Sequence, residues 1–471
     1  MASSFPTIPD LAAMRRTIHK AMSSRIEGTV WSVGRNALKV VAMPAPMGAV
    51  CQIRTRGGDA LLAEVIGFEG SITLLAPLDG ADGVSPGDRV LLMQAAPLVS
   101  VSPAMLGRVV DAAGNPLDDL PPIEAVAKIT LDSAPISAMQ RPTIDEISAT
   151  GVRTIDALLT LGRGQRLGIF AGSGVGKSTL LGMMARGTSA DIVVIGLVGE
   201  RGREVQEFLQ RELGEEGRRK CITVVATSDQ PALRRVQAAM TATAIAEYFR
   251  DTGKNVLLMM DSVTRFAMAQ REIGLAAGEA PTTRGYPPSV FSMLPRLVER
   301  AGTGPRGTIT GIYTVLVEGD DTNEPISDTL RGLLDGHVVL SRSIAHRGRY
   351  PAIDVLGSLS RLQSHLVDAK HLEAATKIRS LISSYQENED LITIGAYQRG
   401  SSANVDRAIA LKPAIDAFLS QSSKQKVSWN DTVKALAQLA AQANATNQPA
   451  VQPAPGALPA QAARPAQVAA R

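Results

Sequence analysis

The chain has 471 residues, of which 45% are hydrophobic and 20% charged, and its formal net charge is +4. This is the composition of a globular protein of about three domains, and so small a charge does not indicate a nucleic-acid partner. No apolar run is long enough to span a membrane, and residues 1–30 lack the apolar core of a signal peptide, so we expect a cytoplasmic protein. Cys51 and Cys221 lie too far apart in sequence to suggest a disulfide framework or a metal site.

Residues 1–23 form a segment of their own. Apolar residues recur at helical spacing with basic residues between them, the pattern of a short amphipathic basic helix; the apolar positions are Leu11, Met14, Ile18 and Met22. Such a helix suits docking to a partner protein or to anionic lipid. An ordinary first helix packed on its own domain remains the alternative.

Residues 24–97 predict a small closed β-barrel. Short runs rich in Val, Ile and Leu alternate with turn signals such as Pro86-Gly87-Asp88. Six strands at this spacing suit a barrel. The predicted strands are Ile26–Val33, Leu38–Met43, Ala49–Thr55, Leu61–Phe68, Ser71–Leu75 and Arg89–Met93.

Residues 98–372 alternate strands with helices, which predicts a parallel sheet covered on both faces. Four strands are clear from their apolar runs: Ile192–Val198, Thr223–Ala226, Val256–Met260 and Thr308–Val317.

A phosphate-binding loop lies within this region. The apolar run Leu167–Phe170 leads into a glycine-rich turn, and a helix-forming run, Thr179–Arg186, follows. The loop residues are Ala171, Gly172, Ser173, Gly174, Val175, Gly176, Lys177, Ser178 and Thr179. Ala171 stands where the motif has glycine, and a small residue there still permits the turn. We expect the backbone to cradle a polyphosphate, Lys177 to contact it and Ser178 to hold Mg²⁺.

Two carboxylates follow buried strands. Asp261 ends an apolar run, and an aspartate in this position beside a phosphate loop holds Mg²⁺. Glu200 follows the run Ile192–Val198, and the carboxyl end of a strand in an α/β sheet is where ligands bind. Glu200 is therefore a candidate to orient the attacking water, although a surface glutamate at a charged helix start is the alternative.

Residues 373–445 predict a helical domain, with helices at Lys377–Gln386, Asn404–Ser420 and Trp429–Gln442. The tail, 446–471, is rich in Ala, Pro and Gln, and we expect it to be disordered.

Seven further motifs stand out: Gly199–Glu204, Ala226–Leu233, Thr243–Asp251, Asp261–Gly274, Arg284–Phe291, Val317–Pro325 and Pro351–Ser360. They resemble motifs of the ATP synthase α/β family, and within it those of the type III protein export ATPases. The likeness spans roughly residues 24 to 420.

The resemblance implies roles for further residues. Glu200 matches the catalytic carboxylate, and Arg201 the arginine that shapes the γ-phosphate pocket. Arg361 matches an arginine finger offered to the neighbouring subunit, and Tyr350 an aromatic that stacks on adenine. The implied fold is a RecA-like core with an N-terminal six-stranded barrel and a C-terminal helical domain, and the implied cofactors are ATP and Mg²⁺.

The resemblance also implies partners. Family members form ring-shaped homo-hexamers with active sites between subunits and a central stalk protein in the ring. In the flagellar branch the N-terminal helix docks on a regulatory stalk protein, while the C-terminal helices face export chaperones and the export gate. We accordingly expect peripheral placement at the cytoplasmic face of the inner membrane.

The flagellar branch is favoured because Ser228–Ala232 reads Ser-Asp-Gln-Pro-Ala, and the stretch Tyr385–Tyr397 also looks flagellar. The ATPase of a virulence (injectisome) secretion system is the main alternative. A hexameric RNA translocase is a remote one, because the barrel region holds only Trp31 and Phe68 for stacking on bases. A nucleotide-binding structural subunit without turnover is opposed by Lys177, Glu200 and Arg361 together.

Overall fold

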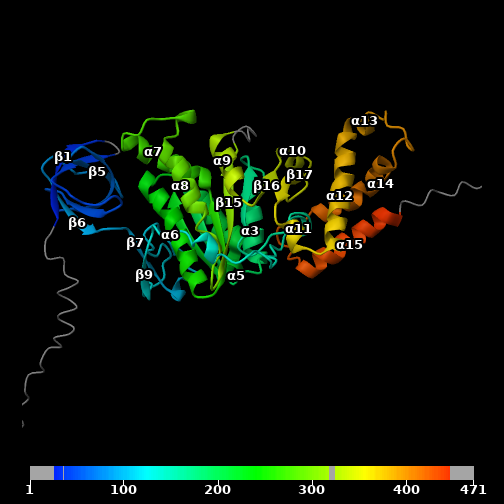
Figure 1. The fold of residues 1–471 in the computed structure, drawn as a ribbon, viewed down its shortest axis with the longest axis horizontal. Coiled ribbons are helices and arrows are strands. Elements are labelled where there is room, and N and C mark those ends of the chain that lie inside the picture. Colours follow the sequence, from blue (N-terminus) through cyan, green and yellow to red (C-terminus); the bar gives the residue numbers. More distant parts are fainter. Residues whose placement is uncertain (1–25, 35–36, 318–323, 446–471) are drawn as a thin grey trace, which may run out of the picture.

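The structure is a computed structural model that describes residues 26–34, 37–317 and 324–445. Three parts follow one another along its longest axis: a barrel, a sheet covered by helices and a group of C-terminal helices (Figure 1). The predicted helix at 1–23 and the predicted disordered tail at 446–471 lie outside the described residues. None of the described helices combines the length and the hydropathy that a membrane crossing requires.

The first part is a closed barrel of six antiparallel strands, as the sequence predicts, in the order β1-β2-β5-β4-β3-β6. Side chains alternate between its interior and its surface: on β1, Val30 is buried and Trp31 is 58% exposed. The strands are β1 (Glu27–Val33), β2 (Leu38–Val41), β3 (Val50–Arg54), β4 (Ala60–Glu69), β5 (Ile72–Pro77) and β6 (Arg89–Gln94).

The second part is a sheet of nine strands in the order β17-β16-β10-β15-β13-β11-β12-β8, with β14 paired to β15. The pairs from β16 to β8 are parallel, as predicted, whereas β17 and β14 pair antiparallel. The strands are β8 (Val109–Val110), β10 (Arg166–Ala171), β11 (Ile192–Glu200), β12 (Cys221–Thr227), β13 (Asn255–Asp261), β14 (Gly302–Thr303), β15 (Thr308–Leu316), β16 (Gly336–Leu340) and β17 (Ile353–Ser360).

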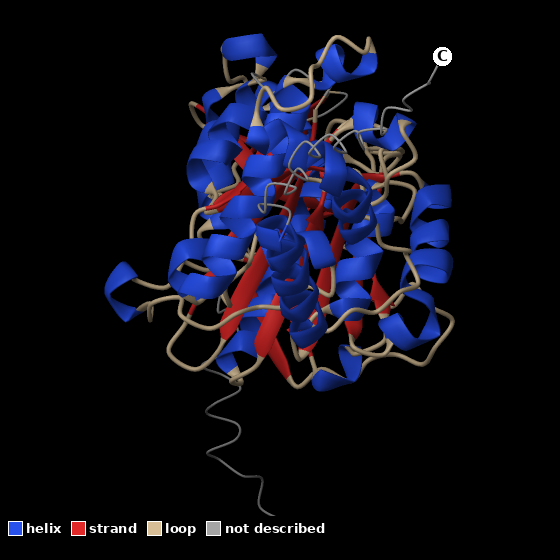
Figure 2. Cartoon of the chain, turned by 90° about the vertical axis from the view of Figure 1, so that its right-hand side faces the viewer, coloured by secondary structure: helices blue, strands red, loops and turns tan. Residues whose placement is uncertain are grey.

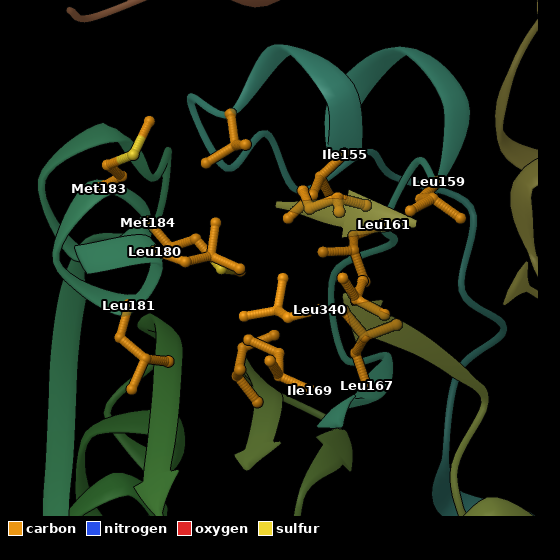
Figure 3. Packing of buried hydrophobic residues seen from close by; sticks show 14 of the residues in the cluster. Ile155, Leu159, Leu161, Leu167, Ile169, Leu180, Leu181, Met183, Met184 and Leu340 are labelled. Atoms are coloured by element: carbon orange, nitrogen blue, oxygen red, sulfur yellow. The ribbon is translucent and has the colours of Figure 1, made fainter. Parts of the chain in front are cut away.

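Both faces of this sheet are covered by helices (Figure 2). On β11, Val193 and Ile195 belong to one apolar cluster, while Ile192 and Val194 belong to the other. Figure 3 shows the first cluster, in which Leu180 and Met184 lie over the sheet. Helix α3 (Lys177–Gly187) supplies these residues, and α6 (Ala232–Asp251), α7 (Val263–Ala276) and α8 (Pro288–Val298) cover the other face. Because both faces are covered, the central strands β11 and β13 are buried along almost their whole length rather than at alternate residues.

The third part is built from α12 (Ala369–Glu387), α14 (Ala403–Leu419) and α15 (Trp429–Ala445), and it includes all three predicted helices. These helices share the first apolar cluster with α2 (Arg153–Leu158), so the C-terminal helices pack directly on the nucleotide-binding part.

Several short elements escape prediction from sequence. Strands β7 (Leu98–Val101) and β9 (Ala127–Thr130) form a small antiparallel sheet of their own. The remaining helices among residues 26–34, 37–317 and 324–445 are η1 (Pro103–Met105), η2 (Ala138–Gln140), α4 (Gly202–Glu207), the π-helix η3 (Phe208–Leu213), α5 (Gly214–Arg218), η4 (Thr283–Gly285), α9 (Pro325–Leu333), α10 (Arg342–His346), α11 (Gln363–Leu366) and α13 (Glu389–Thr393).

Candidate nucleotide-binding site

The phosphate loop has the strand–loop–helix form that its sequence predicts. Ala171 ends β10, residues 172–176 form the loop, and Lys177, Ser178 and Thr179 open α3. Gly174 and Gly176 have φ of 78° and 91°, which favours glycine at both positions. Ala171 lies within the strand, so a methyl group there does not obstruct the turn. The backbone N–H groups of the loop and the positive end of the α3 dipole therefore face the same point.

Lys177 lies between the two predicted carboxylates. Its Nζ is 2.5 Å from Oδ1 of Asp261 and 3.2 Å from Oε1 of Glu200. The Lys177 and Glu200 side chains are only 13% and 12% exposed, and that of Asp261 is 4% exposed. Thr314 of β15 also donates to Oδ1 of Asp261, at 2.7 Å. The carboxyl ends of β10, β11 and β13 thus meet at one charged cluster, Lys177–Glu200–Asp261.

The charges in this cluster depend on one another. Burial raises the pKa of Glu200 above its ordinary value, against the attraction of Lys177, which lowers it. Burial likewise works against the charge on Lys177, yet Asp261 and Glu200 hold the pKa of Lys177 above its usual value. The lysine is therefore a firmly charged ammonium, and the glutamate is a stronger base than an exposed one.

The backbone before Glu200 is shaped by a glycine. Gly199 has φ of 72°, and the pairing of β11 with β12 is irregular between Val198 and Glu200. A Cβ on Gly199 would lie 3.0 Å from Cβ of Arg265. Both the conformation and the close approach favour glycine, and this turn of the chain directs Glu200 toward Lys177.

The hydroxyl groups after Lys177 differ in their surroundings. Ser178 is exposed. Thr179 donates its hydroxyl to Oε1 of Glu212 at 2.8 Å, so it ties α3 to η3. Of the two, Ser178 is the better placed to meet a ligand.

Tyr350, the residue expected to stack on a base, lies beside the phosphate loop. A Cβ on Gly176 would be 3.6 Å from Cδ1 of the Tyr350 ring, which is the distance of ordinary contact. The residue is 47% exposed, so one side of it is open to a ligand.

The two remaining arginines lie at the surface. The Arg201 side chain is 77% exposed and pairs with Glu204 at 3.4 Å. Arg361 is exposed, directly follows β17 and donates to the carbonyl oxygen of Arg331 at 3.2 Å. The structure therefore joins Lys177 to the two carboxylates and leaves these guanidinium groups facing outward.

Sequence reasoning missed two residues at this site. Thr314 fixes Asp261, and Arg342 lies so close to the loop that a Cβ on Gly172 would be 2.6 Å from its Nη2. Arg342 lies two residues after Leu340, the last residue of β16, and therefore at the same edge of the sheet as Lys177. The feature of the sequence that could have identified Arg342 is its position just after an apolar strand.

Comparison with known families matches most of the chain. Residues 24–93 match the β-barrel domain of the ATP synthase alpha/beta family, and residues 151–360 match the nucleotide-binding domain of the same family. Residues 367–438 match the family described as T3SS EscN ATPase C-terminal domain.

Curated relatives and solved structures agree with these matches. The chain is 54% identical over 395 residues to the flagellum-specific ATP synthase of Bacillus subtilis, covering 83% of this chain and 90% of that one. It is 49% identical over 424 residues to the type 3 secretion system ATPase of Xanthomonas euvesicatoria, covering 90% and 96%. The assembled ATPase EscN from the enteropathogenic E. coli type III secretion system superimposes with a TM-score of 0.84 at 46% identity, covering 88% of this chain and all of that one. EscN in complex with its central stalk EscO gives a TM-score of 0.82 at 45% identity.

Proposed function

The chain belongs to the ATP synthase α/β family, and we propose that it is the ATP-hydrolysing motor subunit of a flagellar type III protein export apparatus. The observation that carries the proposal is the Lys177–Glu200–Asp261 cluster beneath the phosphate loop. It provides a cation for phosphate, a base for water and a carboxylate for a metal, which together are the parts that phosphoanhydride hydrolysis needs.

Binding of a triphosphate changes the partners of Lys177. In the cluster its ammonium neutralises Glu200 and Asp261. Phosphate oxygens in the loop compete for the same ammonium, so nucleotide binding frees the two carboxylates for water and metal. Glu200, whose pKa burial raises, then accepts a hydrogen bond from the attacking water and orients it toward the γ-phosphate.

The residues present suit Mg²⁺. Ser178 offers an exposed hydroxyl beside the loop, and Asp261 offers a carboxylate whose contacts with Lys177 and Thr314 both involve Oδ1. Oxygen donors of this kind are those that Mg²⁺ prefers. Mg²⁺ held by these residues would neutralise negative charge on the phosphate oxygens.

The exposed arginines support an assembly in which the site is completed between subunits. Arg361 is free of the Lys177 cluster in its own protomer, as a finger offered to a neighbour would be. We propose a homo-hexameric ring in which Arg361 reaches the nucleotide of the neighbouring subunit, while Arg201, beside Glu200, shapes the γ-phosphate pocket of its own subunit. The proposed ring holds a central stalk protein and attaches peripherally to the inner membrane. A regulatory stalk protein binds residues 1–23, and the export chaperones and the export gate bind the C-terminal helices.

The injectisome reading has specific support of its own. The Xanthomonas relative and EscN are type III secretion ATPases that share nearly half of their aligned residues with this chain. We favour the flagellar assignment because of Gln230 in Ser228–Ala232 and the Bacillus relative. Deleting the gene should abolish secretion of rod and hook proteins; loss of virulence-effector secretion with normal flagella would favour the injectisome.

A pair of measurements tests the enzymatic part. The purified protein should release phosphate from ATP at steady state, and Glu200→Gln should bind a fluorescent ATP analogue as tightly while releasing little phosphate. Retained turnover in Glu200→Gln would remove Glu200 from its proposed role.

A further inference from the structure

The C-terminal helices are joined to the nucleotide-binding part by a buried glutamine. Gln421 follows α14 and is only 5% exposed. Its Oε1 accepts a hydrogen bond from the backbone N–H of Arg153 at 2.8 Å, and its Nε2 donates to the carbonyl oxygens of Gly151 at 2.8 Å and Gln425 at 3.0 Å. The amide therefore uses both its donor and its acceptor, and it holds two distant segments together.

The backbone of the same residue holds Tyr350. The N–H of Gln421 donates to the carbonyl oxygen of Tyr350 at 2.9 Å. The Tyr350 ring in turn lies against Gly176 of the phosphate loop. One hydrogen bond and one contact thus lead from the end of α14 to the loop.

The same turn also reaches the far end of α3. Arg186, in the last turn of α3, donates to the carbonyl oxygen of Ser423 at 2.7 Å. Gly151, which Gln421 holds, packs backbone to backbone against Gly187: a Cβ on Gly151 would lie 2.7 Å from Cα of Gly187. Both ends of α3 are therefore connected to the turn that contains Gln421: the N-terminal end through Tyr350 and Gly176, and the C-terminal end through Arg186 and Gly187.

The geometry points to Gln421 as a positioning residue that fixes Tyr350 relative to the phosphate loop and so sets the affinity for the base of the nucleotide. This inference rests on the proposed stacking of Tyr350 on adenine. Gln421 touches no part of the nucleotide itself. Without its side-chain bonds to Gly151 and Arg153, residue 421 can shift, and the carbonyl and ring of Tyr350 shift with it. The phosphates, held by the loop backbone and Lys177, are affected less.

The test separates the base from the phosphates. Gln421→Met keeps the length of the side chain and removes its hydrogen bonds; Gln421→Glu faces a carboxylate toward two carbonyl oxygens. Gln425→Met is the matched control, because that side chain lies on the same turn and is exposed. For each full-length variant, KM and kcat for Mg²⁺–ATP are measured, together with inhibition by inorganic tripolyphosphate, which has no base.

We expect KM for ATP to rise about three- to tenfold in Gln421→Met, the equivalent of one net hydrogen bond, and further in Gln421→Glu. Inhibition by tripolyphosphate should stay within about twofold of wild type, and Gln425→Met should match wild type throughout. An equal loss of tripolyphosphate binding, or an unchanged KM for ATP, would overturn the inference.

Two further arms keep the test decisive. Tyr350→Ala should raise KM for ATP without changing tripolyphosphate inhibition; if it does not, the stacking role proposed for Tyr350 fails. If Tyr350→Ala behaves as expected and Gln421→Met does not, the inference about Gln421 alone fails. Should the Gln421 variants not fold, hydrogen exchange of the wild-type protein decides: ADP, but not tripolyphosphate, should slow exchange of the Gln421 amide, and equal protection would contradict the inference.

Discussion

The ammonium of Lys177 lies 2.5 Å from Oδ1 of Asp261, and this pair ties the first turn of α3 to the end of β13. Two segments that are far apart in sequence thus meet in one nearly buried contact. Because the contact is nearly buried, it fixes the position of the lysine ammonium beside the phosphate loop. Glu200, on the other side of the same ammonium, completes the cluster.

Replacing Glu200 by glutamine should stop turnover and spare binding. The amide keeps the size of the side chain and a hydrogen bond in the cluster, but it cannot accept a proton. We expect the rate of phosphate release to fall by about 10²–10⁴, the usual contribution of a general base. Isothermal titration with a non-hydrolysable ATP analogue should give an unchanged dissociation constant, and a matched exchange at exposed Glu215 of α5, Glu215→Gln, should leave most of the rate.

Lys177→Ala and Arg361→Ala should each be inactive for defects on opposite sides of a subunit interface. Mixed rings then contain interfaces that pair an intact Lys177 with an intact Arg361. We expect the mixture to regain part of the wild-type phosphate-release rate. Absence of recovery in rings shown by mass spectrometry to be mixed would count against a finger in trans.

We expect the stability of the fold to depend on pH through Glu64, where the barrel contacts helix α6. Glu64 of β4 accepts a hydrogen bond from Nε2 of Gln237 on α6 at 3.0 Å, beside a cavity of about 270 Å³ also lined by Asp132 and Arg296. Burial raises the pKa of Glu64 from 4.5 to about 7, with Asp132 adding to the rise and Gln237 opposing it.

An acid with a raised pKa binds its proton more tightly in the folded state. The stability that protonated Glu64 contributes is therefore complete below pH 4.5 and is lost as the pH rises through about 7. Glu64→Gln should remove this dependence and raise the free energy of unfolding at pH 8 by about 1–3 kcal/mol. Urea denaturation of the wild-type protein and of Glu64→Gln at pH 5 and pH 8 measures this difference in unfolding free energy. An equal effect of the substitution at both pH values would contradict a raised pKa for Glu64.

The buried pair Arg300–Glu247 should matter more for stability than an exposed pair nearby. Nη2 of Arg300 lies 2.7 Å from Oε2 of Glu247, and both side chains are less than 10% exposed. Arg300→Met leaves the glutamate buried without its partner, and we expect a loss of about 3–5 kcal/mol in unfolding free energy. Arg296→Met breaks the exposed pair with Asp132, and thermal or urea unfolding should show a loss of at most about 1 kcal/mol.

Local patterns in the sequence predicted much of the fold. The six barrel strands are short runs rich in Val, Ile and Leu between turn signals, and each observed strand overlaps its prediction. The phosphate loop and the strand before Asp261 are likewise local, because a short run of residues determines each. Their meeting at Lys177 followed from one general rule, that parallel strands present their carboxyl ends at one edge.

Contacts between distant segments were not predictable in this way. Three contacts depend on how helices and strands pack against one another after they form. They are the hydrogen bond from Gln421 to Tyr350, that from Thr314 to Asp261, and the close approach of Arg342 to Gly172. Nothing in the residues around Gln421 distinguishes it from an exposed glutamine. Its role becomes visible only when α14 is placed beside Gly151 and Arg153.

The central claim is that one protomer grips the triphosphate while Arg361 of the next completes the reactive centre. The phosphate-release rate per protomer, measured over a dilution series alongside the mass of the species present, tests it most directly. We expect the rate per protomer to fall as rings dissociate into single chains. A constant rate from chains shown to be single at every dilution would contradict it.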